Sequence, residues 1–225
     1  SALLKDTHSP PLFLKTIKKE CAIPLTIKIR TGWDSDQMNA DEIVKIAFNE
    51  GINMVAIHGR TRAQQYEGKA NWDYIEKVSA KSPLPIIGNG DLHNHLIIKK
   101  RFKNTSCSAF MVARGCLRNP FIFLESMNEN KDIYFIANDY IFVIHRLFDL
   151  MQSFSESERT QVVQLRKLIA WFSSGFNGSS TFRTTLLQTS QISDILKISE
   201  DYFSSLGTAQ KYINEEEDFL TSGHG

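Results

Sequence analysis

The hydrophobic residues of the first half of the chain gather in four short runs, each about five residues long. These runs are rich in β-branched side chains and occupy residues 24–29, 54–58, 85–89 and 109–113. Nearly continuous apolar runs of this length are typical of parallel strands that are buried on both faces. Their first residues are 30, 31 and 24 positions apart, which leaves room for one helix in each gap. The pattern therefore predicts repeated strand–helix units.

Helical patterns fill the gaps between the runs. Residues 40–50 carry Ile43 and Ala47 on one face and are followed by Gly51, a residue that commonly ends a helix. Asn71 and Asn94 are suited to cap the helices that follow them. Further helices are predicted at residues 71–81, 93–102 and 119–127. This alternation predicts an α/β fold with a parallel sheet and external helices.

The pattern changes after residue 130, where no further strand run occurs. Apolar residues then recur every three or four positions, which predicts amphipathic helices. The first two stripes run from Ala137 to Met151 and from Val162 to Phe172, and two more helices are predicted at residues 182–191 and 195–213. We therefore expect two domains, an α/β domain over residues 1–130 and an all-helical domain over residues 131–225.

Unusual polar residues follow all four predicted strands. Lys28 and Arg30 belong to the first, His58 ends the second, and glycine accompanies the polar residues that end the others. The later endings are Asn89-Gly90-Asp91 and Ala113-Arg114-Gly115. Ligands of parallel α/β proteins bind at the carboxyl ends of the strands, and backbone amides beside glycine can cradle a phosphate. The four endings together indicate a site for an anionic ligand.

Structural readings compete with this interpretation at single positions. A lysine inside an apolar strand is rarely buried unless it is paired, so Lys28 is either functional or part of an ion pair. His58 alone could be a core histidine, although the following G-R-T-R segment favours a functional role. Asn89-Gly90 could be a simple turn, but its place between a strand and a helix suits a ligand-binding loop better.

Composition excludes several classes of protein. The 225 residues include 26 basic and 25 acidic side chains, so the net charge of +1 gives no sign of a dedicated nucleic-acid binder. Cys21, Cys107 and Cys116 are odd in number and irregularly spaced, which argues against a disulfide framework and a zinc cluster. Neither a membrane span nor a signal peptide is predicted. We expect a cytoplasmic protein with reduced, inert thiols.

Several segments resemble the bacterial tRNA-dihydrouridine synthases. They occur in the order and at the spacing typical of that family and cover residues 1–125. The segments are T-I-K-I-R-T-G-W-D at 26–34, H-G-R-T-R at 58–62, Y-E-G-K-A-N-W at 66–72, I-G-N-G-D at 87–91, M-V-A-R-G at 111–115 and N-P-F-I-F at 119–123. Residues 165–167 and 182–183 are weakly similar to the tRNA-binding domain of the family, with Leu168 in place of its usual histidine.

The resemblance implies a (β/α)₈ barrel flavoprotein that reduces uridine in tRNA to 5,6-dihydrouridine. NADPH would reduce bound FMN, the flavin would pass hydride to uracil C6, and a cysteine would protonate C5. Residues that match cofactor-binding positions of the family are Lys28, His58, Asn89, Gly90, Asp91, Ala113 and Arg114. Residues that match RNA-facing positions are Arg60, Arg62, Arg166, Lys167 and Arg183. The target base must be unstacked to reach the flavin.

The same resemblance implies that part of the enzyme is missing from this chain. The acid cysteine of the family lies in a loop that would precede Ser1, so no catalytic residue is expected among the 225 residues. Four strands instead of eight would make residues 1–130 the second half of a barrel. We expect such a half barrel to fold poorly or to associate with itself through its exposed edge, and to be inactive alone.

Two other functions remain open. One is a different FMN-dependent barrel oxidoreductase, similar to dihydroorotate dehydrogenase, although the helical domain and the H-G-R-T-R segment argue against it. The other is a non-catalytic RNA-binding remnant. Bound flavin would favour an enzyme, and tRNA binding without flavin would favour the remnant.

Overall fold

The structure is a computed structural model, and it describes residue 5 and residues 9–127, 133–154 and 157–213. The described residues divide into two compact units. The first unit contains residue 5 and residues 9–93 and 97–113, and the second unit contains residues 94–96 and 114–213 with the stated gaps. Each unit is described by itself below.

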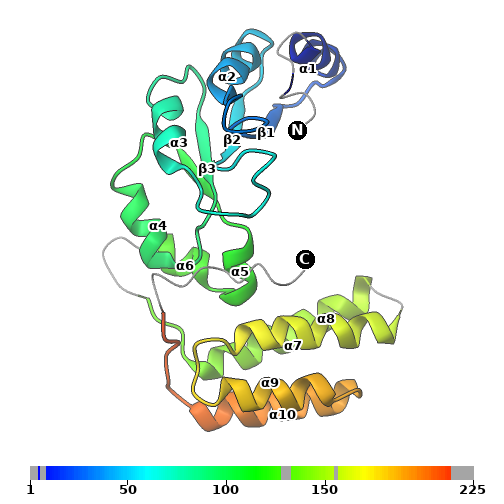
Figure 1. Cartoon of the computed structure of the whole chain (residues 1–225). Coiled ribbons are helices and arrows are strands. Elements are labelled where there is room, and N and C mark those ends of the chain that lie inside the picture. The colour runs from blue at the N-terminus through cyan, green and yellow to red at the C-terminus, as the bar shows by residue number, and fades with distance from the viewer. Residues whose placement is uncertain (1–4, 6–8, 128–132, 155–156, 214–225) are drawn as a thin grey trace. The chain divides into compact units, whose positions relative to one another are not determined.

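A four-stranded parallel sheet forms the centre of the first unit (Figure 1). Its strands follow one another in space in sequence order, as expected for repeated strand–helix units. They are β1 (Thr26–Arg30), β2 (Met54–His58), β3 (Ile86–Asn89) and β4 (Ala109–Met111). The prediction of an α/β fold with a parallel sheet is confirmed.

One helix, α1 (Ser9–Glu20), precedes the first strand of this sheet. The helices that connect the strands are α2 (Ala40–Asn49), α3 (Trp72–Ser79) and α4 (His95–Phe102). The helices α2 and α3 pack against β2 and β3, and α1 packs against α2. The predicted cap of α3 is confirmed, because the Asn71 side chain accepts a hydrogen bond from the Tyr74 amide at 2.9 Å.

Burial of the strands departs from the prediction at both edges of the sheet, since β4 is only partly buried and β1 is the more exposed of the two. β2 and β3 are almost entirely buried, as their apolar sequences predict. β1 is only partly buried and its Lys28 side chain is exposed, so the expectation that Lys28 lies in a buried strand is wrong. The physical reason is that β1 is an edge strand with β2 as its one neighbour in the sheet.

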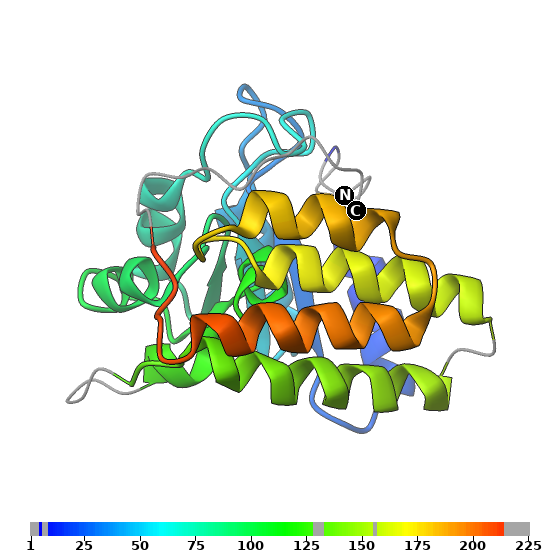
Figure 2. The same cartoon turned by 90° about the horizontal axis from the view of Figure 1, so that it is seen from below.

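The second unit is helical in its described residues (Figure 2). Two short helices come first, α5 (Arg114–Arg118) and α6 (Ile122–Met127). Four longer helices follow: α7 (Ala137–Phe154), α8 (Glu158–Phe172), α9 (Ser179–Gln188) and α10 (Ile192–Leu206). α7 packs against α8 and α10, and α9 packs against α8 and α10, so the four form a bundle.

The core of the bundle is rich in aromatic rings. The Tyr140 ring is stacked on Phe203 with 5.6 Å between the centroids, and it meets Phe176 edge to face at 5.4 Å. Phe172 and Phe182 are buried in the same core. Of these rings, only Phe172 belongs to an apolar stripe predicted from the sequence. Burial of the aromatic rings against one another stabilises the assembled helices.

Several boundaries differ from the predictions. The helix predicted at 195–213 ends at Leu206, because Gly207 has a φ of 55° and the chain then turns back. The Ala137 amide donates to the Ala209 carbonyl at 2.9 Å in this returning segment. The helix predicted at 119–127 begins at Ile122, and α1 and α5 were not predicted. α1 was missed because it buries only Pro10 and Leu14, too few residues for a clear period.

No helix among the described residues is both long enough and apolar enough to cross a membrane.

Candidate functional site

The register of the sheet brings predicted site residues into one row. Arg30 pairs with His58, His58 pairs with Asn89, and Asn89 pairs with Met111. These positions are at or beside the carboxyl end of each strand, and neighbouring residues in register point to the same face of a parallel sheet. We call Arg30, His58 and Asn89 the strand-end row. The sequence placed these residues on separate strands, and the sheet brings them together.

Two cations of β1 lie on the face of the strand-end row. Lys28 and Arg30 are two residues apart and therefore point to the same side of β1. Partial burial, and then the charge of Arg30, lower the pKa of Lys28. The Arg30 guanidinium donates to the Thr61 carbonyl at 2.7 Å and to the Gln65 carbonyl at 3.1 Å. Arg30 is thereby held by the loop after β2, while Lys28 remains exposed.

His58 is a buried imidazole among cations. Its pKa is lowered to about 4, chiefly by burial and then by the charges of Lys28, Arg30 and Arg60, which Asp91 offsets in part. The ring is therefore neutral near pH 7, because a proton there would be added to an already positive surrounding. A neutral imidazole can donate one hydrogen bond and accept another.

The backbone after β3 makes a tight, unusual turn beside His58. Gly90 has a φ of 126° and Asp91 a φ of 51°, both in the range that ordinary side chains avoid. A side chain at Gly90 would come within 2.7 Å of the Ala70 Cβ atom and within 3.2 Å of the His58 ring. Glycine is required here by both the backbone angle and the space.

A buried ion pair fixes this turn. Arg60 Nη1 lies 2.7 Å from Asp91 Oδ1, and Arg60 Nη2 lies 3.0 Å from Asp91 Oδ2, so the contact is bidentate. The side chains are only 4% and 19% exposed. Arg60 also donates to the carbonyls of Glu67 and Gly68, and Asp91 accepts from the Ala70 amide at 2.6 Å. The pair ties the loop after β2 to the turn after β3.

The pKa of Asp91 reflects this balance. Burial alone would raise the pKa of the carboxyl group, but the hydrogen bonds from Arg60 and Ala70 and the charges of Arg60 and His93 together hold it below its ordinary value. Asp91 is therefore ionised near pH 7, and Arg60 neutralises it. The other cations near the strand-end row keep their positive field, which favours an anionic ligand.

Asn89 and Trp72 support the same edge of the sheet from within. The Asn89 side-chain amide donates to the Met111 carbonyl at 2.6 Å, which ties β3 to β4. The Trp72 indole N–H donates to the Gly90 carbonyl at 3.0 Å. Its ring meets Phe110 edge to face at 5.3 Å. These bonds orient the turn, as expected for residues that shape a site rather than fill it.

The other predicted cofactor residues divide between the two units. Ala113 ends the described part of the first unit, and Arg114 begins α5 in the second. Each of the two takes part in interactions within the protein.

The residues predicted to face RNA have different surroundings. The Arg60 guanidinium is buried and bound to Asp91, so a positioning role fits it better than an RNA contact. Arg62 is exposed, with its guanidinium 5.0 Å from the centre of the Trp33 ring. Arg166 donates to the carbonyls of Leu187 and Thr189 at 2.6 and 3.2 Å, which anchors the end of α9.

Lys167 and Arg183 lie on α8 and α9 of the second unit. Lys167 is exposed, and its ammonium group lies 5.0 Å from the centre of the Trp171 ring. Arg183 is half-buried, and its charge affects Tyr202. Of the second-unit residues predicted to face RNA, Lys167 and Arg183 are the two that lie at the surface of the bundle.

The sequence placed Arg30 among the polar strand endings, but the family resemblance gave it no role, and the Arg60–Asp91 pair was not foreseen. A role for Arg30 follows from its position two residues after Lys28 on one strand, which gives both side chains the same face. The pair joins residues 31 positions apart, and nothing local in the sequence indicates it. Among the described residues, no group of His, Cys, Asp and Glu side chains could hold a metal ion.

Comparison with known proteins explains why these segments occur together. The family model described as dihydrouridine synthase matches residues 1–206. This chain belongs to the dihydrouridine synthase family. The strand-end row and the Arg60–Asp91 pair lie within the matched residues.

Named relatives agree with this assignment. A probable tRNA-dihydrouridine synthase of Rickettsia prowazekii (strain Madrid E) is 33% identical over 210 residues, which are 91% of this chain and 64% of the relative. The tRNA-dihydrouridine synthase B of Pasteurella multocida (strain Pm70) is 35% identical over 188 residues, 81% of this chain and 56% of the relative. The chain thus spans less than two thirds of the length of these relatives.

A solved mandelate oxidase mutant aligns with 90% of this chain and 74% of its own, at 12% identity and a TM-score of 0.31. A similarity this low carries no argument about fold or function.

Proposed function

We propose that this protein binds FMN at the strand-end row and takes part in the reduction of uridine in tRNA to 5,6-dihydrouridine, with NADPH as the reductant. The observation that carries the proposal is the register of the sheet, which aligns Arg30, His58 and Asn89 beside a glycine turn. Membership in the dihydrouridine synthase family and the names of the relatives support the choice of reaction.

The residues present fit a phosphorylated flavin. Gly90 allows a tight turn packed against Ala70 and His58, which places backbone amide groups beside the strand-end row. The cations Lys28 and Arg30 favour a negatively charged group on the same face. Bound FMN would supply hydride transfer, chemistry that protein side chains lack.

The predicted cofactor residues of the first unit each have a proposed role in holding such a flavin. Lys28 would supply a positive charge near the flavin ring, and neutral His58 would supply a hydrogen bond. Asn89, Gly90 and Asp91 would hold the phosphate-bearing tail, and Arg60 holds their turn through Asp91. Ala113 and Arg114 are assigned to the phosphate group because they match cofactor-binding positions of the family.

The same proposal includes an eight-stranded barrel and a cysteine that donates the proton. The four strands correspond to half of an eight-stranded barrel. Cys21 and Cys107 precede β1 and β4, so they lie toward the opposite strand ends from the strand-end row. Neither suits the acid that the reaction requires, and we assign that acid to the cysteine loop of the family.

The second unit would bind the body of the tRNA. Lys167 and Arg183 offer positive charge on the bundle surface, and phosphate contacts by such residues are weakened by salt. Changing both to Glu should weaken tRNA binding and lower its dependence on salt, whereas Lys45→Glu on α2 serves as a control for net charge.

Flavin binding tests the core of the proposal. The full chain should bind FMN, measured by quenching of flavin fluorescence, and Lys28→Met should weaken this binding by about tenfold. Lys45→Met removes an exposed lysine of α2 and should leave it unchanged. Equal FMN binding by both variants would contradict the assignment of Lys28. The proposed reaction would be wrong if a protein of the full length of the relatives that contains this chain formed no dihydrouridine in tRNA.

A further inference from the structure

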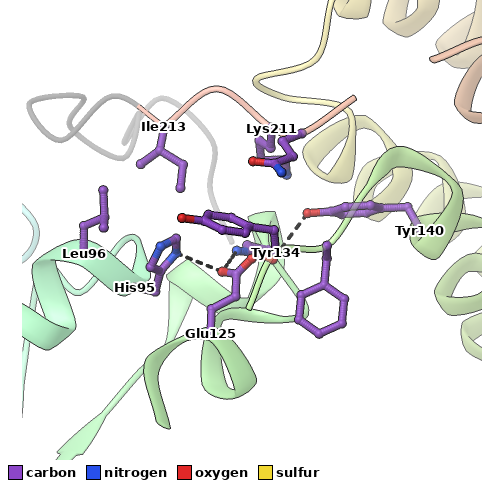
Figure 3. A pocket seen from close by; sticks show the side chains of 10 residues that line it. His95, Leu96, Glu125, Tyr134, Tyr140, Lys211 and Ile213 are labelled. Carbon is purple, nitrogen blue, oxygen red and sulfur yellow. Dashed lines mark hydrogen bonds and ion pairs between the residues drawn. The ribbon is translucent and has the colours of Figure 1, made fainter. Parts of the chain in front are cut away.

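The second unit contains a cavity of about 210 Å³ that the proposed flavin site does not use (Figure 3). Its walls come from the start of α4, from α6, from the residues before α7 and from the returning segment after α10. Aromatic, acidic and basic side chains all line it. The cavity is therefore a candidate site for a small polar ring.

A buried polar cluster forms one wall. Glu125 Oε2 lies 3.0 Å from His95 Nδ1 and accepts a hydrogen bond from the Asn119 side chain at 2.6 Å. The Tyr140 hydroxyl donates to Asn119 Oδ1 at 3.3 Å. His95, Asn119, Glu125 and Tyr140 are all buried, so this wall is held rigidly in place.

Lys211 lies on the opposite side of the cavity, together with Ile213 (Figure 3). Its ammonium group donates to the Arg118 carbonyl at 2.6 Å and lies 4.9 Å from the centre of the Tyr140 ring and 5.6 Å from that of Phe176. Burial lowers the pKa of Lys211 to about 7, although Glu125 acts in the other direction. A bound acceptor would therefore favour the charged form of Lys211.

Glu125 and Lys211 line the same space without meeting. Within the described part of the chain, no ion pair of 4.0 Å or less joins them. A carboxylate and an ammonium group that stay apart across a cavity are each left with hydrogen-bonding capacity. A ligand that donates to one and accepts from the other would satisfy both and would hold Lys211 in its charged form.

Tyr134 supplies a flat surface at this cavity. Its side chain is 54% exposed, although it lines the cavity. Next to it, Phe135 is stacked on Phe121 with 3.9 Å between the ring centroids. Exposed aromatic rings of this kind hold unstacked bases in RNA-binding proteins.

We propose that this cavity binds a single unstacked base of RNA that presents an N–H group next to a carbonyl group, as guanine and uracil do. The N–H would donate to Glu125, the carbonyl would accept from Lys211, and the ring would lie against Tyr134. Adenine lacks the carbonyl, and cytosine lacks the ring N–H. The choice of RNA as the source of the base rests on the proposed function.

Mononucleotide binding to the full chain tests the proposal. By titration calorimetry, GMP and UMP should bind more tightly than AMP and CMP, by about tenfold. Lys211→Met and Tyr134→Ser should each weaken GMP and UMP binding by about tenfold. Tyr212→Ser is the matched control, since Tyr212 is 76% exposed, follows Lys211 directly and does not line the cavity.

The outcomes separate this proposal from the proposed function. Equal binding of the four nucleotides, or equal effects of Tyr134→Ser and Tyr212→Ser, would overturn the base-binding cavity even if the chain binds tRNA. Selective binding of GMP and UMP without tRNA binding would support the cavity and overturn the assigned RNA substrate. Tyr134→Ser changes an exposed residue, so the test stands even if Lys211→Met fails to fold.

Discussion

Buried charge is arranged in opposite ways in the two units. In the first unit, Arg60 meets Asp91 in a bidentate ion pair, and each partner has further hydrogen bonds to the backbone. In the second unit, Lys211 is buried against the rings of Tyr140 and Phe176, with a carbonyl as its hydrogen-bond acceptor. The first arrangement stabilises a fixed charge, whereas the second lowers the pKa of the lysine.

The difference shows why residue type alone says little about role. Lys28 occupies an apolar strand and yet is exposed, because β1 is an edge strand. Lys211 follows no apolar motif and yet is the lysine with the larger change in pKa. Neighbours in space decide which cation can serve a ligand and which is enclosed by the fold.

Substitutions in the aromatic core of the second unit should lower the free energy of unfolding the most. Phe203→Ala removes a fully buried ring that contacts Tyr140 and Phe176, and should lower the free energy of unfolding by about 3–5 kcal/mol. Phe154→Ala removes a ring that is 87% exposed and should cost less than about 0.5 kcal/mol. Urea denaturation followed by circular dichroism compares them. Similar losses in both variants would contradict the aromatic core.

Breaking the ion pair of the first unit should cause the next largest loss in free energy of unfolding. Arg60→Met leaves the Asp91 carboxylate partly buried without its guanidinium partner and should cost about 3 kcal/mol. Arg62→Met, two residues away, removes only an exposed contact with Trp33 and should cost less than about 1 kcal/mol. Intrinsic tryptophan fluorescence during urea unfolding, measured in a Trp171→Phe background, reports the first unit through Trp33 and Trp72. Equal costs would mean that the pair adds nothing to stability.

The pH dependence of stability should distinguish the two arrangements further. The pKa of Lys211 is about 7 in the folded chain and 10.5 in the unfolded chain, so the unfolded chain binds more protons between these values. Stability should therefore rise with pH from about 7 to about 10.5, by up to about 1.4 kcal/mol for each pH unit. The measurement is the difference between the parent chain and Lys211→Met at each pH. An identical pH dependence in both would exclude a buried ammonium group.

The NMR signals of the His58 ring in the folded chain should show the smallest change with pH. Because its pKa is about 4, the ring stays neutral from about pH 8 to about pH 5, and its NMR signals should barely move in that range. In urea, the same ring should titrate near its ordinary value of 6.5. Folding should therefore become less favourable as the pH falls below about 6.5. A folded-state midpoint near 6.5 would contradict the cationic surroundings of His58.

Much of the fold could be predicted because it depends on local periodicity. The apolar run at 54–58 coincides with β2, and the stripe from Ala137 to Met151 lies within α7. α1 and α5 escaped prediction because they are weakly periodic or short. Of the candidate site, His58 and Asn89 were predicted and lie side by side, since parallel strands bring their carboxyl ends to one edge.

By itself, the sequence determined the strand–helix alternation, the later helices and the polar residues at the strand ends. These follow from the spacing of side chains along one chain. Only the tertiary structure decided that Arg60 is bound to Asp91, that Lys28 is exposed and that Lys211 faces Glu125 across a cavity. Those outcomes depend on the paths of loops and on contacts between distant residues, and a charge acquires its role from the groups that surround it.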